Sequence, residues 1–276
     1  MKWFIALNSV CGTYEFYARM IQVAVTSALE NTELSPHLLF DGTSNELTAW
    51  FERQGGTVLY CRSSFAENLA TLAAQKGDRN IHTIGSGAFI RVDIPRILTE
   101  RGIDDEYVLY TDCDVMFLQN PVPILKKIRC RYFAVSAEDR IGNYRAMNTG
   151  VMLMNTRNLG RTLPGFSSYI RSHLEQLCAG TWDQDAYREY YRFPRQRWCQ
   201  PWSFYQWTPL PEILNWKPYW GKNPAAEIVH FHGPKPFMQE AVARGEIPEA
   251  YQQLASEGYN DYCRIWNRIR AKIEPK

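Results

Sequence analysis

Two aspartates stand two residues apart directly after an apolar run. The run is 107–110, and Asp112 and Asp114 follow it with Cys113 between them. In an extended chain, residues i and i+2 point to the same side, so both carboxylates face one space. Their charges repel each other, and a hard divalent cation would relieve this and take phosphate oxygens at its remaining positions. The alternative is a solvated Asp-rich turn, because the D-x-D triplet alone is common.

A second polar cluster follows another apolar strand late in the chain. His230 and His232 stand there, with Gly233 and Lys235 close behind. A histidine can be a third ligand of the same cation. Gly233 lets the backbone approach a diphosphate closely, and Lys235 supplies a point charge for it. A plain strand-to-turn exit is the alternative, but two histidines with a glycine and a lysine in six residues favour a site.

With three further segments, these motifs resemble the GT-A glycosyltransferases of family eight, which include bacterial lipopolysaccharide galactosyltransferases and glycogenin. The resemblance covers roughly residues 2–237. In chain order, the matching residues are Arg91 on the helix before the D-x-D strand, Asp112-Cys113-Asp114 as the D-x-D motif, Asn148-Thr149-Gly150 as a turn entering a strand, Asp183-Gln184-Asp185 as a helix start, and the segment 230–236.

The resemblance implies a metal-dependent sugar transfer from a nucleotide sugar, with retention of configuration. Asp112, Asp114 and His230 would hold the ion. Carboxylate and imidazole ligands together with phosphate oxygens suit Mn²⁺ better than Ca²⁺, and Mg²⁺ is the other candidate. The family pattern has two residues between the glycine and the lysine of the last motif, whereas here Pro234 alone separates them. His232 is therefore the alternative third ligand.

The resemblance also assigns the other site residues. The expected donor-binding residues are Asn8, Arg91, Asp112, Cys113, Asp114, Asn148, Thr149, Gly150, Gly233 and Lys235. Asn8 stands where the family contacts the nucleotide base, which favours the uracil of a UDP-sugar.

The expected catalytic groups are Asp183 and Gln184 beside the sugar, and Lys235 at the leaving diphosphate. For Asp185, a carboxylate that stabilises the helix N-terminus is as good an interpretation as a functional one. Gln184 stands where the family places a residue near the anomeric carbon, but an amide is a poor nucleophile. We therefore favour a front-face route, in which the leaving phosphate helps to deprotonate the acceptor.

The elements that must position these residues alternate in type. Strands are expected at 3–7, 37–40, 57–61, 107–110, 132–136, 150–155 and 228–231, and helices at 15–31, 45–54, 88–101, 158–177, 183–191 and from 236 onward. The alternation in the first third predicts a parallel sheet covered on both faces. Asp112 and Asp114 then lie at the carboxyl end of a strand, where open α/β sheets bind ligands. Gly85-Ser86-Gly87 is expected to be a loop with a serine cap.

The expected fold is a GT-A α/β domain with a mixed central sheet over 1–236 and a helical C-terminal extension over 237–276. In that extension, an apolar stripe of Ile265, Trp266, Ile269 and Ile273 is surrounded by Arg264, Arg268, Arg270 and Lys272. Such a helix can lie on an anionic membrane surface, here through 263–276. It can equally pack its stripe on the protein's own core.

Composition excludes several other classes of protein. The chain has 276 residues, 45% hydrophobic and 22% charged, as in ordinary globular proteins. Its net charge of +2 lacks the basic excess of nucleic-acid-binding proteins. Seven cysteines without a C-x-x-C pair argue against a disulfide framework or a structural zinc site. We therefore expect a cytoplasmic protein, either free or peripheral on the inner face of the membrane.

Aromatic residues gather between 182 and 220. We expect most of them to form a hydrophobic subdomain, with one or two rings lining an acceptor cleft. The tryptophans concerned are Trp182, Trp198, Trp202, Trp207, Trp216 and Trp220, joined by Tyr190, Tyr191, Phe204, Tyr205 and Tyr219.

Two other functions are compatible with these residues. A nucleotide-sugar hydrolase or nucleotidyltransferase would use the same carboxylate–metal site. A non-catalytic carbohydrate-binding protein would bind glycans without the metal. The function that the motifs favour is transfer from a nucleotide sugar to a glycan or a lipid-linked saccharide.

Overall fold

A seven-stranded mixed sheet lies at the centre of the molecule. The computed structural model describes residues 1–144, 146–192 and 206–273. In order across the sheet, the strands are β3 (Thr57–Tyr60), β2 (Ser35–Asp41), β1 (Lys2–Asn8), β4 (Tyr107–Thr111), β7 (Met147–Asn155), β6 (Phe133–Ala137) and β8 (Thr208–Pro209). The strands β3, β2, β1 and β4 are parallel, as predicted. Because β7 is antiparallel to both β4 and β6, the carboxyl ends of β4 and β6 meet at one edge.

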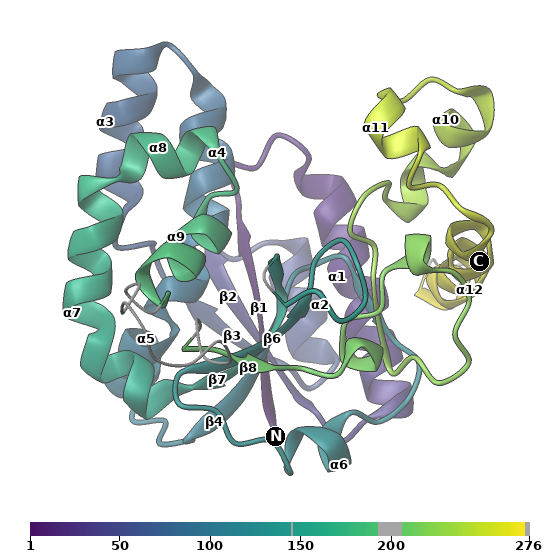
Figure 1. Cartoon of the computed structure of the whole chain (residues 1–276), viewed down its shortest axis with the longest axis horizontal. Helices are drawn as coiled ribbons and strands as arrows, with labels where there is room; N and C mark the ends of the chain where they lie inside the picture. Colours follow the sequence, from purple (N-terminus) through teal and green to yellow (C-terminus); the bar gives the residue numbers. More distant parts are fainter. Residues whose placement is uncertain (145, 193–205, 274–276) are drawn as a thin grey trace, which may run out of the picture.

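Helices cover both faces of this sheet (Figure 1). Alternate residues of β1 enter different hydrophobic clusters, Trp3 and Ile5 on one face and Phe4 and Ala6 on the other, because successive side chains of a strand point to opposite faces. On the first face pack α1 (Tyr14–Asn31), α2 (Glu46–Arg53) and α6 (Val122–Leu125). On the second pack α3 (Ala66–Lys76), α4 (Arg79–Ala88), α5 (Ile94–Glu100), α7 (Thr156–Ser172), α8 (Leu174–Ala179) and α9 (Asp183–Tyr190).

A separate two-stranded sheet joins the two motifs that are farthest apart in the sequence. Strand β5 (Val115–Phe117), which the sequence did not predict, is antiparallel to β9 (Ile228–His230). In this pairing Val115 lies opposite His230. The backbone thus places His230 next to Asp114.

The helix expected over 88–101 is wrong as a single element. Helix α4 ends at Ala88, a 3₁₀ turn covers Phe89–Asp93, and α5 follows. Pro95 is tolerated only because it lies in the first turn of α5, where its missing N–H is not needed.

The loop expected at Gly85-Ser86-Gly87 is also wrong, because these residues lie inside α4. A Cβ on Gly85 would come within 2.7 Å of the Leu69 side chain. The glycine therefore allows α3 and α4 to pack closely rather than breaking the helix.

Helix α3 was not predicted, and one further expected helix is interrupted. The helix expected over 158–177 is divided into α7 and α8 at His173. The Nδ1 atom of His173 lies 2.9 Å from the carbonyl oxygen of Tyr169, so the side chain competes for a backbone group at the helix end. Apolar periodicity continues through such a break and does not reveal it.

The C-terminal region is helical, as expected, with α10 (Gln239–Arg244), α11 (Glu249–Gln252) and α12 (Glu257–Ile273) after a 3₁₀ turn at Pro236–Met238. Trp266 and Ile269 of α12 are only 2% and 7% exposed, and they share a hydrophobic cluster with Met20 and Val23 of α1. The apolar stripe thus packs on the protein's own core, which was one of its two expected positions. No helix in the described ranges is long and apolar enough to cross a membrane.

The described aromatic residues of 182–220 mostly pack in the core, as predicted. Tyr191 and Trp207 belong to the cluster under α7 and α9, and Trp216 belongs to the cluster under α12. Four of the expected rings, Trp198, Trp202, Phe204 and Tyr205, lie outside the described residues.

Replacing Trp266 tests the packing of α12. Trp266→Ala should lower the free energy of unfolding by about 3–5 kcal/mol, because it leaves a cavity between α12 and α1. Urea unfolding followed by circular dichroism measures this. Arg268→Ala, on the exposed side of the same helix, is the control and should change the value by less than about 0.5 kcal/mol. A loss below about 1 kcal/mol for Trp266→Ala would contradict the packing.

Candidate active site

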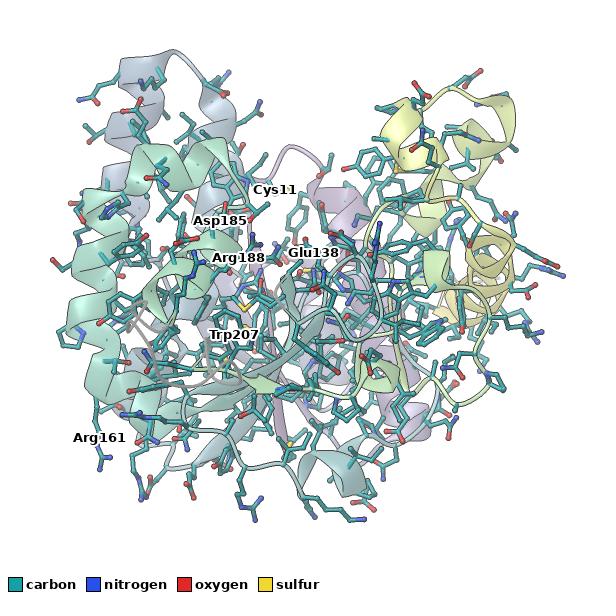
Figure 2. All side chains as sticks on the ribbon, viewed as in Figure 1. Cys11, Glu138, Arg161, Asp185, Arg188 and Trp207 are labelled. Carbon is teal, nitrogen blue, oxygen red and sulfur yellow. The ribbon has the colours of Figure 1, made fainter. Side chains whose placement is uncertain are left out.

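A cavity of about 630 Å³ lies at the carboxyl ends of β1, β4 and β6. Parallel strands of α/β sheets bind ligands at this edge. Two of its lining residues, Cys11 and Glu138, are seen in Figure 2 in the middle of the molecule, between the helices α3, α4 and α8 and the helices α10 and α11. Twelve of the residues predicted for the site line it, namely Asn8, Arg91, Asp112, Cys113, Asp114, Asn148, Thr149, Asp183, Gln184, His230, His232 and Lys235.

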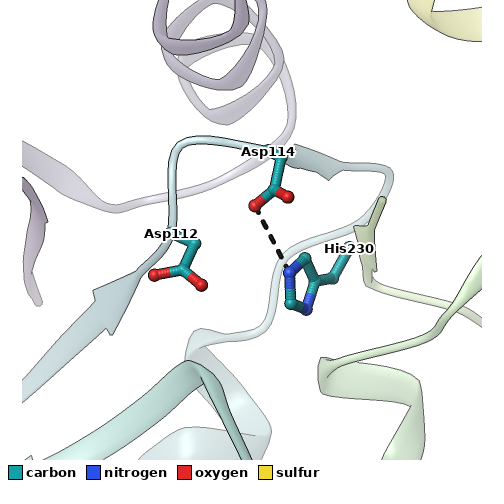
Figure 3. A group of neighbouring side chains, drawn as sticks. All are labelled: Asp112, Asp114 and His230. Atoms are coloured by element: carbon teal, nitrogen blue, oxygen red, sulfur yellow. Dashed lines mark ion pairs between the residues drawn. The ribbon is translucent and has the colours of Figure 1, made fainter. Parts of the chain in front are cut away.

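Asp112, Asp114 and His230 converge in this cavity (Figure 3). One oxygen of each carboxylate and one ring nitrogen of His230 lie within 4.8 Å of one another. The Phe231 N–H donates to the carbonyl oxygen of Asp114 at 2.8 Å, which holds the two chain segments together. His232 is not part of this group, so His230 is the better placed of the two candidate ligands.

The three side chains fit a divalent cation. Burial lowers the pKa of His230, and Asp114 opposes this only in part. The net lowering favours the neutral ring. Burial raises the pKa of Asp114, but Lys235 and then His230 hold it below its usual range. The Oδ1 atom of Asp114 is buried and accepts no hydrogen bond from the described residues, although the Nε2 atom of His230 lies 3.3 Å away. Ionised carboxylates and a neutral imidazole are the forms that bind metal.

Arg91 is buried beneath Asp112 and connects four segments. Its Nη2 atom lies 2.8 Å from Oδ1 of Asp112, and its Nε atom lies 2.8 Å from Oδ2 of Asp183. Its Nη1 atom donates to the carbonyl oxygen of Thr149 at 2.6 Å. Its guanidinium carbon is 4.5 Å from the centre of the Tyr110 ring. Burial disfavours the charge, but Asp112 and Asp183 raise the pKa of Arg91, so it stays cationic.

Gln184 is engaged at both ends of its amide. Its Oε1 atom accepts from the backbone N–H of Thr149 at 3.0 Å and lies 3.4 Å from Nδ2 of Asn148. Its Nε2 atom donates to Oε1 of Glu138 at 2.8 Å. The amide is therefore held as part of the cavity wall and is not free to act as a nucleophile.

The turn before Gln184 is strained. Trp182 has φ 56° and is the one non-glycine residue with positive φ in the described ranges. Helix α9 begins at the next residue, Asp183, whose carboxylate lies 2.8 Å from Arg91. Asp185 accepts from the backbone N–H of Thr181 at 2.7 Å, which favours its role at the helix N-terminus.

Glu138 is a site residue that the sequence interpretation missed. It directly follows β6 and lines the cavity, with its side chain 16% exposed. Its Oε1 atom lies 3.5 Å from Nε2 of His232, and its Oε2 atom 3.6 Å from Nη2 of Arg188. Burial raises the pKa of Glu138, but His232 and Gln184 bring it below its ordinary value. The available signal was an acidic residue directly after a predicted strand, the same signal that identified Asp112.

Four predicted residues have roles that the sequence did not indicate. The Asn8 side chain donates to the carbonyl oxygen of Thr83 at 2.7 Å, which fixes it between β1 and α4. The thiol of Cys113 points to β1, where it contacts the carbonyl oxygen of Ala6 at 3.2 Å. Gly233 adopts φ +111°, a conformation that favours glycine, and is not among the lining residues.

The fourth is Gly150, which lies under the ring of His230. A Cβ at this position would come within 2.1 Å of the Cε1 atom of His230. The glycine is therefore required by the imidazole, and it does not itself line the cavity.

Lys235 lies beside the acidic pair. Its Nζ atom is 2.5 Å from Oδ2 of Asp114 and donates to the carbonyl oxygen of Phe231 at 2.8 Å. The short loop after Gly233 thus still brings the ammonium into the cavity. Lys235 and Arg91 offset part of the negative charge of Asp112, Asp114 and Asp183, and burial raises the pKa of Asp183 to about 7 although Arg91 opposes this.

No protein family model matches the sequence, and no curated protein matches it either. Solved structures do match. The galactosyltransferase LgtC, in complex with donor and acceptor sugar analogues, has a TM-score of 0.61 at 19% identity, over 92% of this chain and 95% of that one. The glycosyltransferase GlyE of Streptococcus pneumoniae TIGR4 has a TM-score of 0.61 at 16% identity, over 98% of this chain and 63% of that one.

Mouse xyloside xylosyltransferase 1 has a TM-score of 0.57 at 15% identity, over 84% of this chain and 98% of that one. These likenesses show that the chain has the GT-A fold. They confirm the predicted fold class, with its mixed sheet and helical C-terminal region.

Gly150 offers a test of how the candidate cation ligands are held. Gly150→Ala should weaken the binding of Mn²⁺ by about 10-fold or more, because the new Cβ displaces the His230 ring. Electron paramagnetic resonance of free Mn²⁺ during a titration without nucleotide measures this. Gly160→Ala is the matched control, because a Cβ there meets only Pro95, at 3.7 Å. Unchanged Mn²⁺ affinity in Gly150→Ala would contradict the assignment of His230 as a ligand.

Proposed function

We propose that the protein is a metal-dependent glycosyltransferase. It would move a sugar from a nucleoside-diphosphate sugar, with UDP-sugars favoured, to a hydroxyl of a glycan or a lipid-linked saccharide. The observation that carries the proposal is the convergence of Asp112, Asp114 and His230, with Lys235 beside them, at the ligand-binding edge of a GT-A sheet. The cavity of about 630 Å³ is within the range of small-molecule sites.

The main task of these residues would be to stabilise the negative charge of the diphosphate. A bound Mn²⁺ or Mg²⁺ would supply Lewis acidity to the diphosphate and neutralise charge on the leaving group. Asp112, Asp114 and His230 would hold the ion, while Lys235 supplies a second positive charge nearby. Preorganised charges of this kind stabilise a developing anion more than those of water do, because they need not reorient.

The hydrogen bonding of the Asn8 amide favours a uridine nucleotide as the donor. Its amide N–H is occupied by the carbonyl oxygen of Thr83, which leaves its Oδ1 atom to accept a hydrogen bond. Uracil has an N–H donor at position 3, whereas cytosine has an acceptor there. Gly87 lies opposite and carries no side chain to block the space.

Glu138 and His232 lie at the Nε2 end of the Gln184 amide. Both side chains are suited to hydrogen bonds with sugar hydroxyls. An ionised carboxylate accepts hydrogen bonds from hydroxyls, and imidazole can donate or accept. Because Gln184 is held by internal hydrogen bonds, we keep the front-face route. In it, the acceptor oxygen bonds to the anomeric carbon as the bond to the phosphate oxygen breaks, and the acceptor proton passes to the leaving phosphate.

A donor screen tests the function. UDP-, GDP- and CDP-sugars are incubated with Mn²⁺ and a mixture of saccharide acceptors, and released nucleotide and new glycosides are measured. UDP with a new glycoside is expected. Release of sugar phosphate or pyrophosphate would instead indicate nucleotidyl transfer, and free sugar alone would indicate hydrolysis.

The matched variants assign the activity to the metal site. Asp114→Asn should lower turnover by about 10²-fold or more, because it weakens the hold on the cation and its Lewis acidity together. Asp139→Asn changes an exposed carboxylate close to the cavity and should leave turnover unchanged. Turnover that resists both a chelator and Asp114→Asn would contradict the proposal.

A further inference from the structure

A chain of buried hydrogen bonds leads from the backbone to the ring of His230. The backbone N–H of Gly150 donates to Oδ1 of Asn148 at 3.1 Å. The Nδ2 atom of Asn215 donates to the same oxygen at 3.0 Å. The Oδ1 atom of Asn215 lies 2.9 Å from Nδ1 of His230. Asn148, Asn215 and His230 are all at most 3% exposed, so solvent does not substitute for these bonds.

The backbone fixes the direction of every bond in this chain. A backbone N–H only donates, so the atom of Asn148 that faces Gly150 must be its oxygen. Asn215 must then turn its NH₂ group toward Asn148 and its oxygen toward His230. Since that oxygen only accepts, the Nδ1 atom of His230 must carry the hydrogen.

A second backbone group gives the same orientation independently. The N–H of Thr149 donates to Oε1 of Gln184 at 3.0 Å, which fixes the direction of the Gln184 amide. That oxygen lies 3.4 Å from the other end of Asn148, which must therefore be its NH₂ group. Rotating the Asn148 amide by 180° would place its NH₂ group against the Gly150 N–H and its oxygen against Oε1 of Gln184.

The other nitrogen of His230 then carries a lone pair. It lies 3.3 Å from Oδ1 of Asp114, the buried oxygen that receives no hydrogen bond from the described residues. An unrestrained imidazole would place its hydrogen on this nitrogen and bond to the carboxylate. With the hydrogen on Nδ1, two acceptors face each other instead, and a cation between them satisfies both.

We propose that Asn215 is a positioning residue that fixes His230 as the Nδ1–H tautomer and so presents Nε2 to the metal site. The proposal rests on the proposed function for its metal, but the tautomer is a property of the metal-free protein. It also gives Asn148 and Gly150 a role beneath His230, in addition to the donor binding expected for them.

Two variants separate the hydrogen bond from the packing. Asn215→Leu keeps a similar volume and removes the acceptor for Nδ1. It leaves no other donor unpaired, because Asn148 still accepts from Gly150, so the chain should fold. Asn215→Asp is the matched control. It keeps an acceptor facing Nδ1 but sets a second carboxylate oxygen against Oδ1 of Asn148 in a buried position, so its thermal unfolding is measured beside that of Asn215→Leu.

Long-range ¹H–¹⁵N spectra of the metal-free protein at about pH 8 measure the tautomer, because protonated and unprotonated ring nitrogens resonate far apart. A His230→Gln variant identifies the signals among the five histidines. The wild type and Asn215→Asp should show a protonated Nδ1, and Asn215→Leu should lose this preference. A wild-type His230 protonated at Nε2, or an Asn215→Leu spectrum like that of the wild type, would overturn the proposal.

Titration with Mn²⁺ alone gives the consequence for binding. Asn215→Leu should bind Mn²⁺ about 10–100-fold more weakly than the wild type, as loss of a histidine-orienting partner usually does, and Asn215→Asp should lie much closer to the wild type. Equal affinity in all three proteins would overturn the role of Asn215. If the wild type has the Nδ1–H tautomer but binds no Mn²⁺, the metal of the proposed function fails while the assigned tautomer stands.

Discussion

The carboxylates of Asp112, Asp114 and Asp183, of which the last two are buried, are the constraint on which the rest of the site depends. Unpaired buried charges are costly, and removing one partner of a buried pair typically costs about 3–5 kcal/mol. Arg91 forms ion pairs with Asp112 and Asp183 at 2.8 Å each, while Lys235 lies 2.5 Å from Asp114. The pair of Lys235 and Asp114 joins segments 121 residues apart in the sequence, and Arg91 joins the segments of Asp112 and Asp183. The arrangement leaves Asp114 and His230 facing each other with unused acceptor atoms.

Several irregular features of the backbone follow from this constraint. The 3₁₀ turn Phe89–Asp93 carries Arg91 inward between α4 and α5. The positive φ of Trp182 starts α9 so that Asp183 meets Arg91. The pairing of β5 with β9 brings His230 against Asp114. Gly150 leaves room for the imidazole ring above it. Each of these features lies next to a charged side chain or to His230, and the strained one, Trp182, directly precedes Asp183, in keeping with strain being retained at functional sites.

The sequence could predict those parts of the structure that depend on local pattern. Buried strands such as Tyr107–Thr111 follow from continuous apolar runs, and the position of Asp112 and Asp114 follows from the end of that strand. It could not predict Asn215, which stands alone between apolar residues and whose partners Asn148 and His230 are distant in the chain. The role of Gly150 was also hidden, because it depends on a ring contributed by another sheet. Gly85 resembled a loop residue because its close neighbour, Leu69, belongs to another helix.

In the proposed function, Asp112, Asp114 and His230 hold a divalent cation against a nucleoside diphosphate. Pulsed electron paramagnetic resonance of Mn²⁺ bound together with UDP tests it most directly, in protein labelled with ¹⁵N-histidine. We expect coupling of Mn²⁺ to ³¹P and to one imidazole nitrogen in the wild type. The nitrogen coupling should be lost in His230→Gln but not in His232→Gln. Coupling to ³¹P without any nitrogen coupling, or nitrogen coupling that survives in His230→Gln, would contradict the account.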